Sequence, residues 1–194
     1  MIAGIVLAGG RSRRMGRRKA TLKVGNETFL ERAARVLREG GCEDIVVVLG
    51  VDEPELADFT TGSPIRATRT GGGAEQIDSL RAGLRALPAA ARAVVVIPVD
   101  HPLIEPGTVA ALIEAFEDGG APVARVSHKG RHGHPVLFAA AVFDELLNED
   151  LPDGARTLVR SHAADLIDVD VDDPGVLIDI DTPTDYSEHL GELG

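Results

Sequence analysis

The chain begins with an apolar run that leads into glycines and then into a dense cluster of cations. Residues 2–7 are apolar, Ala8, Gly9 and Gly10 follow, and residues 11–19 carry six of the 20 Lys and Arg side chains of the whole sequence. A strand that ends in a glycine turn lets backbone amides approach anionic oxygens without a Cβ in the way, and clustered Arg and Lys neutralise further charge. Because the formal net charge of the protein is -11, this local concentration of cations predicts a site for a polyanion, which we interpret as a nucleoside triphosphate loop.

The basic cluster has an alternative interpretation, because short runs of Lys and Arg often serve as nuclear-localisation or nucleic-acid-binding segments. The rest of the chain is acidic and would repel a nucleic-acid backbone outside the cluster. Side chains that could stack on bases are also scarce, since the sequence has one Tyr, five Phe and no Trp. We therefore expect a small polyanion as the partner and no nucleic acid.

Length and composition are typical of one globular domain. With 194 residues, of which 44% are hydrophobic, the chain can bury a core of its own. The lone Cys42 supports neither an internal disulfide nor a cysteine zinc site. The apolar start is too short for a signal peptide or a membrane span, so we expect a cytoplasmic protein without membrane contact.

Apolar runs alternate with segments of helical period, which indicates an α/β fold with a mostly parallel sheet. In the first 120 residues we expect strands at 2–7, 45–50, 65–68 and 93–99. A capping box of Thr28 and Glu31 predicts a helix that ends at Gly40 and Gly41. Further helices are expected over 54–59, over 107–118, and from Asp78 as N-cap to residue 87.

After residue 120 the pattern changes to short strands and short helices. Residues 123–126 and 136–138 predict antiparallel strands around a long turn over 127–133. Helices 141–148 and 155–162, strands 166–171 and 176–180, and a helix that starts at Pro183 complete the prediction. We expect one domain over 1–194, with an NTP-binding half over 1–120 and an acceptor-binding half over 121–194.

The glycine turn differs from two common phosphate loops. A dehydrogenase fingerprint needs G-x-G-x-x-G, whereas the glycines here are Gly9, Gly10 and Gly16. A kinase-type loop ends in Gly-Lys-Ser or Gly-Lys-Thr, whereas Arg17 follows Gly16 and Ala20 follows Lys19. Residues 7–19 instead fit L-A-G-G-x-S-x-R-M-G-x-x-K, which resembles the signature of the MobA-like nucleotidyltransferases, enzymes that use an NTP and release pyrophosphate.

Four later segments resemble motifs of the same family in the same order. They are S-L-R-A-G-L at 79–84, D-H-P-L at 100–103, G-H-P-V-L-F at 133–138 and D-I-D-T-P-T-D-Y at 179–186. The last two are similar to the molybdenum cofactor cytidylyltransferase branch, whereas Gly9 and Gly10 are more like the guanylyltransferase branch. The resemblance implies a Rossmann-like three-layer sandwich of the nucleotide-diphospho-sugar transferase type, with CTP as the favoured donor and GTP as its close rival.

Two aspartates are the candidate metal ligands. Asp100 follows an apolar run at the end of an expected central strand, where open α/β sheets bind their ligands, and Mg²⁺ prefers one or two carboxylates with phosphate oxygens. The alternative role of Asp100 is a turn or helix cap. Asp181 follows another apolar run and is the second candidate, with N-capping of the helix at Pro183 as its alternative role and Asp179 as the competing ligand.

Cationic and polar side chains complete the candidate site. Lys19 and Arg14 would stabilise the charge of the departing pyrophosphate, because nucleotidyl transfer depends on positioning and electrostatics. By resemblance, the nucleotide-binding residues are Leu7, Ala8, Gly9, Gly10, Arg11, Ser12, Arg14, Lys19 and Ser79. Ser79 could instead cap its own helix. His134, in the G-H-P motif, and His101 are the candidates for contact with the acceptor.

These expectations combine into one reaction, in which a terminal phosphate of an acceptor attacks the α-phosphorus of an NTP while Asp100 and Asp181 hold Mg²⁺. The resemblance implies molybdopterin, the pterin of the molybdenum cofactor, as the phosphorylated acceptor and a molybdoenzyme as a candidate protein partner. Two other functions stay open, namely transfer to a different phosphorylated small molecule and a non-catalytic chaperone that binds a nucleotide or pterin.

Overall fold

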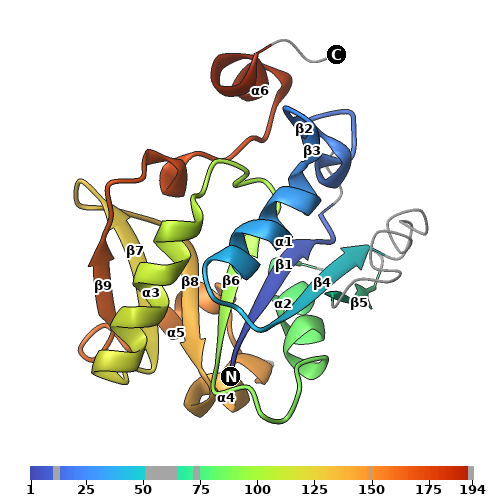
Figure 1. Ribbon diagram of the computed structural model, residues 1–194. Coiled ribbons are helices and arrows are strands. Elements are labelled where there is room, and N and C mark those ends of the chain that lie inside the picture. Colours follow the sequence, from blue (N-terminus) through green and yellow to red (C-terminus); the bar gives the residue numbers. More distant parts are fainter. Residues whose placement is uncertain (11–13, 51–64, 72–74, 149, 192–194) are drawn as a thin grey trace.

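The computed structural model describes residues 1–10, 14–50, 65–71, 75–148 and 150–191 (Figure 1). Within these residues the centre is a seven-stranded sheet in the order β5-β4-β1-β6-β8-β7-β9. Its strands are β1 (Ile2–Ala8), β4 (Asp44–Gly50), β5 (Ile65–Thr70), β6 (Ala93–Pro98), β7 (Val123–His128), β8 (Arg131–Ala139) and β9 (Ile167–Asp170). β8 runs antiparallel to β6 and β7, and the other neighbouring strands are parallel. The expected mostly parallel sheet with an antiparallel insertion is confirmed.

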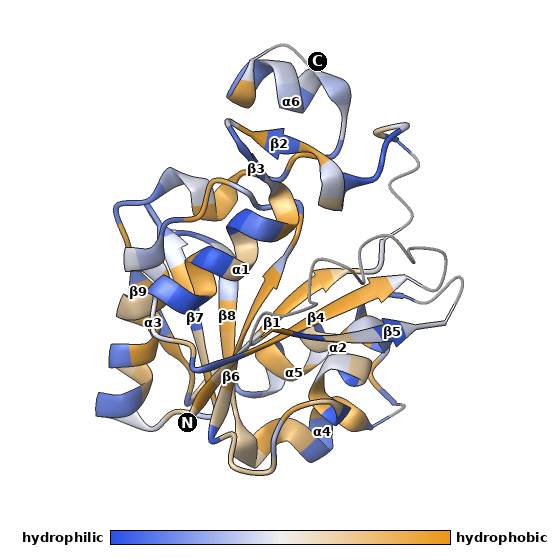
Figure 2. Cartoon of the chain, turned by 45° about the vertical axis from the view of Figure 1, so that its right-hand side comes forward, coloured by the Kyte–Doolittle hydropathy of each residue, from blue (hydrophilic) through white to orange (hydrophobic). Residues whose placement is uncertain are grey.

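Helices cover both faces of the sheet, because its central strands β1, β4 and β6 are apolar on both sides (Figure 2). On β1, Ile2 and Val6 join the core cluster under α1 (Phe29–Glu39) and α3 (Pro106–Gly119). The alternate residues Ile5 and Leu7 join the cluster under α2 (Gln76–Arg85), α4 (Phe143–Leu147) and α5 (Ala155–Ser161). The three-layer sandwich is thus confirmed. Among the described residues, no helix is both long enough and apolar enough to cross a bilayer.

A smaller unit lies at one end of the sandwich. It consists of the hairpin β2 (Lys23–Val24) and β3 (Glu27–Thr28) and the helix α6 (Pro183–Leu190), which lie side by side in both ribbon views (Figures 1 and 2). A 3-10 helix, Lys19–Thr21, leads into the hairpin. Segments from the two ends of the sequence therefore meet at this end of the molecule.

The predicted capping box of α1 is confirmed, whereas the predicted N-cap of α2 is wrong. Thr28 and Glu31 form the predicted capping box, and Gly40 is the C-cap of α1. Helix α2 starts earlier than predicted, with Glu75 as N-cap. Asp78 is the third helical residue, and its carboxylate accepts a hydrogen bond from the backbone N–H of Glu75 at 2.9 Å. The expected helix over 54–59 lies outside the described residues.

Two predictions for the second half are wrong. The expected long turn over 127–133 is a tight hairpin, because β7 and β8 continue toward each other and only Lys129 and Gly130 turn the chain, with φ of 51° and 75°. The expected strand over 176–180 is a 3-10 helix, Pro174–Leu177, followed by irregular chain. This segment packs closely on β8, since a Cβ on Gly133 would overlap the carbonyl oxygen of Val176.

Of the remaining short elements, one helix differs from its prediction in detail. The helix expected over 141–148 begins with a 3-10 turn, Ala140–Val142, and continues as α4. α5, β9 and α6 lie where the sequence indicated.

Candidate active site

The glycine turn lies directly after β1, at the edge where the parallel strands end. Leu7 and Ala8 are buried at the end of this strand. A Cβ on Gly9 would lie 2.8 Å from Thr70 Cγ2 and 3.1 Å from Ser79 Oγ, so the end of β5 and the first turn of α2 leave room only for glycine. The structure therefore brings Gly9 and Ser79 together, as the sequence predicted, while Gly10 is exposed. Arg11 and Ser12 lie outside the described residues.

Thr70 is a neighbour of this turn that the sequence analysis missed. It is buried at the end of β5, next to the glycine turn in space although 61 positions away in sequence. Its only sequence signal is its place at the end of an expected parallel strand, where α/β sheets gather their ligand contacts.

Lys19 and two carboxylates form the charged centre of the site. The Nζ atom of Lys19 donates to Asp100 Oδ2 at 2.9 Å and to Asp181 Oδ1. The Lys19 side chain is 12% exposed, against 26% for Asp100 and 28% for Asp181. Burial lowers the pKa of Lys19, but the two carboxylates outweigh burial and raise this pKa above its ordinary value, so Lys19 is a cation.

Arg14 joins the same centre from its exposed side. Its Nη1 atom lies 3.0 Å from Asp181 Oδ2, while the side chain is 76% exposed. Such an exposed ion pair contributes little to stability, so the guanidinium is free to exchange its partner for a ligand anion. The structure thus gathers Arg14, Lys19, Asp100 and Asp181, all of them predicted site residues.

A backbone hydrogen bond sets the two aspartates side by side. The N–H of Ile180 donates to the carbonyl oxygen of Asp100 at 2.8 Å, and the Ile180 side chain is fully buried. The alternative that Asp181 caps the last helix is wrong, because Thr182 is the N-cap of α6. The competing ligand Asp179 is exposed. Among the described residues, Asp181 is thus the aspartate of this segment that contacts Lys19.

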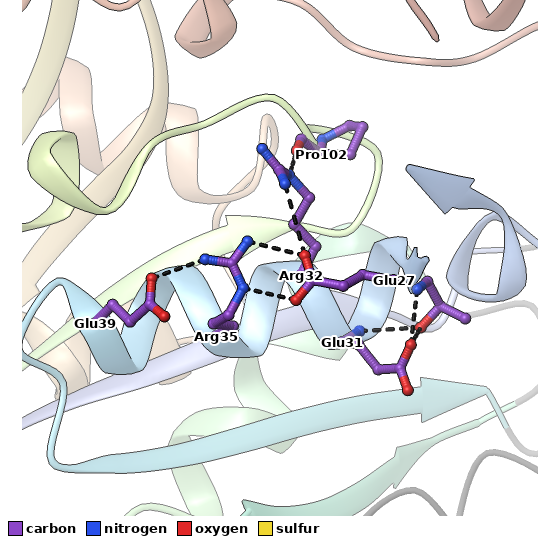
Figure 3. Close-up of polar contacts among 7 residues, drawn as sticks. Glu27, Glu31, Arg32, Arg35, Glu39 and Pro102 are labelled. Carbon is purple, nitrogen blue, oxygen red and sulfur yellow. Dashed lines mark hydrogen bonds and ion pairs between the residues drawn. The ribbon is translucent and has the colours of Figure 1, made fainter. Parts of the chain in front are cut away.

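Helix α1 supports the turn that follows Asp100 (Figure 3). Arg32 Nε donates to the carbonyl oxygen of Pro102 at 2.5 Å. The guanidinium of Arg32 also lies 3.6 Å from the Glu27 carboxylate, which accepts two hydrogen bonds from Arg35 as well. Arg32 is a supporting residue that sequence reasoning missed, since its partner is 70 positions away and belongs to the backbone.

The two predicted acceptor residues face each other beside Asp100. The rings of His101 and His134 meet edge to face with centroids 4.8 Å apart. Burial lowers the pKa of His101, and burial together with His101 lowers the pKa of His134 to about 3. Both imidazoles are therefore neutral near pH 7, and each can offer one donor and one acceptor nitrogen.

His134 also lines a pocket of about 420 Å³ on the α2 and α5 face of the sheet. Its apolar wall includes Leu7, Leu80 and Val136, and Arg156 of α5 adds a cationic side chain. Because Leu7 also ends β1, the pocket adjoins the glycine turn. Glu75, Asp153 and Arg160 also line the pocket, so its polar lining is of mixed charge beside the apolar wall.

The two aspartates have the chemistry of a divalent cation site. Both approach the same ammonium group, and Asp100 Oδ1 is buried without a hydrogen-bond partner among the described residues. A buried carboxylate oxygen without a donor favours a cation as its partner. The described residues hold no cluster of three or more His, Cys, Asp or Glu ligands, and a pair of carboxylates is compatible with Mg²⁺ when phosphate oxygens complete its shell.

Comparisons with known sequences agree with the motif resemblance. Residues 4–166 match the sequence model of the MobA-like NTP transferase domain. The chain is 30% identical over 197 residues to the molybdenum cofactor guanylyltransferase of Xanthomonas euvesicatoria pv. vesicatoria, covering 97% of this chain and 94% of that protein. It is 38% identical over 125 residues to a probable molybdenum cofactor guanylyltransferase of Opitutus terrae, where the match covers 64% of this chain and only 60% of the relative.

Solved structures show the same architecture. The crystal structure of Rv0371c from Mycobacterium tuberculosis H37Rv superposes with a TM-score of 0.84 at 28% identity, covering 98% of both chains. A second structure of Rv0371c, described as a complex with manganese, gives a TM-score of 0.81 at 25% identity over 97% of both chains. The sheet, the glycine turn and the aspartate pair described above thus lie in a framework found in solved proteins.

Proposed function

The chain belongs to the MobA-like NTP transferase family, and from this premise we propose that it transfers a nucleoside monophosphate from an NTP to a molybdopterin-type acceptor and releases pyrophosphate. The observation that carries the proposal is the convergence of Lys19, Arg14, Asp100 and Asp181 beside the glycine turn. Cations for a polyphosphate and carboxylates for a divalent cation are what nucleotidyl transfer requires.

The triphosphate would lie along the glycine turn. Backbone groups from Leu7 to Gly10 border the nucleotide, with Ser79 at the first turn of α2 and with Arg11 and Ser12 following in sequence. The close approach between Gly9 and Ser79 supports this assignment, because it packs the glycine turn against the first turn of α2 and so brings Ser79 beside the backbone that would border the nucleotide.

In the reaction, an oxygen of the acceptor phosphate attacks the α-phosphorus in line with the leaving group. A new bond forms between this oxygen and the α-phosphorus, the bond to the bridging oxygen breaks, and pyrophosphate leaves with the electron pair. Lys19 and Arg14 stabilise the charge on the leaving group. Asp100 and Asp181 would hold Mg²⁺, which supplies neutralisation of phosphate oxygens when bound. No side chain of the protein acts as nucleophile.

The acceptor would occupy the pocket that His134 and Arg156 line. The neutral imidazoles of His101 and His134 can hydrogen-bond a pterin or a phosphate, and Arg156 can pair with an anionic group. As donor we propose CTP, on the G-H-P-V-L-F and D-I-D-T-P-T-D-Y segments. GTP is the second candidate, which the names of the curated relatives favour.

An assay of acceptor-dependent pyrophosphate release tests the proposal. Wild-type protein should release pyrophosphate from CTP or GTP only when molybdopterin and a divalent cation are present. Asp100→Asn should lower kcat by roughly 10² or more, because transition-state charge loses its counter-cation, while thermal melting stays near the wild-type temperature. The matched control is Asp179→Asn, which removes an exposed charge and should change kcat less than about twofold.

The same assay separates the alternatives. A non-catalytic chaperone would bind nucleotide or pterin and release no pyrophosphate with any of the four NTPs. A transferase for another acceptor would release pyrophosphate with a sugar, polyol or lactate phosphate in place of molybdopterin. Near-normal turnover by Asp100→Asn would remove the cation role of this carboxylate.

A further inference from the structure

Asp181 lies at the junction between the sandwich and helix α6. On one side, Ile180 anchors the chain through its hydrogen bond to the carbonyl oxygen of Asp100. On the other side, α6 begins two residues later, and the carboxylate of Asp185 accepts a hydrogen bond from the N–H of Asp181 itself at 3.0 Å. The position of the Asp181 carboxylate therefore depends on where α6 is held.

Two side chains of α6 pack inward, Tyr186 and the partly buried Leu190. All residues of this helix are described, and Tyr186 is the only buried one among them. Its ring stacks on Phe29, with centroids 6.2 Å apart and planes 13° from parallel. Its hydroxyl donates to the carbonyl oxygen of Lys23 at 2.6 Å.

These two partners lie on the segment that carries Lys19. Lys23 starts β2, four residues after Lys19, and Phe29 is the first residue of α1. Tyr186 thus connects the segment that follows Asp181 with the segment that follows Lys19. The two residues of the ion pair between Lys19 and Asp181 therefore each lie close in sequence to a contact of the Tyr186 side chain. Figures 1 and 2 show α6 beside the hairpin and away from the large sheet, where other elements could have held it.

From this arrangement we propose that Tyr186 is a positioning residue that fixes the Asp181 carboxylate beside Asp100 for binding of the divalent cation. The inference rests on the proposed function, because it assigns Tyr186 to the same cation site. Tyr186 touches neither nucleotide nor cation and acts through Asp181. A carboxylate that must be ordered on each binding event binds a cation more weakly than one already held in place.

The test measures Mn²⁺ binding to the nucleotide-free protein by electron paramagnetic resonance of free Mn²⁺. Tyr186→Phe keeps the ring and removes the hydroxyl, and should weaken Mn²⁺ affinity by a factor of about 2 to 10, the range expected for one net hydrogen bond. Tyr186→Leu also removes the stacking and should weaken affinity further. Ser161→Ala is the matched control, because it deletes a hydroxyl that donates to Leu158 on the opposite face, and should leave Mn²⁺ affinity unchanged. Far-UV circular dichroism verifies that each variant is folded.

A double-mutant cycle with Asp181→Asn shows whether Tyr186 acts through Asp181. If it does, Tyr186→Phe causes no further loss of Mn²⁺ affinity in the Asp181→Asn background. Turnover provides a second readout: for Tyr186→Phe the concentration of cation that gives half-maximal rate should rise by the same factor as the Mn²⁺ dissociation constant. Saturating cation should then restore kcat, with the KM for NTP within about twofold of wild type, which a general loss of structure would not produce.

The outcomes separate the two proposals. Unchanged Mn²⁺ affinity in Asp181→Asn would remove Asp181 from the proposed cation site. Weakened affinity in Asp181→Asn together with wild-type affinity in Tyr186→Phe would overturn the positioning role and leave the proposed function standing. Additive losses in the double variant would also overturn it.

Discussion

The buried carboxylate of Asp173 should contribute strongly to folding stability, because it joins the segment around Gly175 to the start of α3. Its Oδ2 atom accepts hydrogen bonds from the N–H of Glu105 at 3.0 Å and from the hydroxyl of Thr108 at 2.7 Å, and its Oδ1 atom accepts from the N–H of Gly175 at 2.8 Å. The side chain thus caps the N-terminus of α3 from a segment 65 residues away. The helix dipole adds to this attraction for an anion.

Asp173→Asn keeps the shape of the side chain and removes one acceptor oxygen. If the amide oxygen takes the place of Oδ2, the amide NH₂ faces the N–H of Gly175, and one buried donor loses its partner at a cost of about 1–3 kcal/mol. The two remaining hydrogen bonds become neutral and each weakens by roughly 1 kcal/mol, while relief of charge burial offsets part of the loss. We expect a net loss of about 2–4 kcal/mol in the free energy of unfolding and a decrease of about 4–16 °C in Tm.

Urea denaturation followed by far-UV circular dichroism measures this loss. Asp172→Asn is the control, because it removes the same charge from the neighbouring exposed residue and should change the free energy of unfolding by less than about 0.5 kcal/mol. Equal stability losses in the two variants would show that the hydrogen bonds of Asp173 contribute nothing beyond its charge and would contradict this prediction.

Two further predictions concern Gly133 and His134. Gly133→Ala should lower the free energy of unfolding, measured by urea denaturation, by about 3 kcal/mol or more, because the added Cβ overlaps the backbone of Val176. The control is Gly107→Ala, whose added Cβ meets no other atom and which should be neutral or stabilising. A Gly133→Ala protein as stable as wild type would contradict the close packing of Gly133 on Val176. Since burial lowers the pKa of His134 to about 3, the unfolded chain binds a proton between about pH 6.5 and 3 that the folded chain does not. The contribution of His134 to the free energy of unfolding is therefore fully present above pH 6.5 and decreases as the pH falls toward 3, by up to about 1.4 kcal/mol per pH unit. Urea denaturation at pH 7 and at pH 5 measures this decrease, which should be smaller for His134→Asn than for wild type.

The sequence predicted those parts of the fold that local signals specify. The apolar runs of β1, β4 and β6, and the capping box of Thr28 and Glu31, need only neighbouring residues to be recognised. The strand predicted over 176–180 failed because an apolar run of this length is also consistent with a buried irregular segment, and contacts of Gly133 and Gly175 with distant backbone decide between them.

Some residues of the candidate site could likewise be predicted from local sequence motifs, and others could not. Lys19, Asp100 and Asp181 could be predicted from motifs, and the roles assigned to them stay predictions until they are measured. The roles of Thr70, Arg32 and Tyr186 could not be predicted, because each depends on neighbours that are distant in sequence. Thr70 packs on the glycine turn, Arg32 donates to the carbonyl oxygen of Pro102, and Tyr186 donates to the carbonyl oxygen of Lys23 and stacks on Phe29. Hydrogen bonds to backbone atoms leave no residue-type pattern in the sequence.

The hydrogen bond from Ile180 to Asp100 has a consequence for biosynthesis. A nascent chain that has released only its first 120 residues from the ribosome already holds the glycine turn, Lys19 and Asp100, but it has no Asp181 to complete the carboxylate pair. The carboxylate pair beside Lys19 can form only after residue 181 has emerged and Ile180 has reached Asp100, so the charged centre is completed late in biosynthesis.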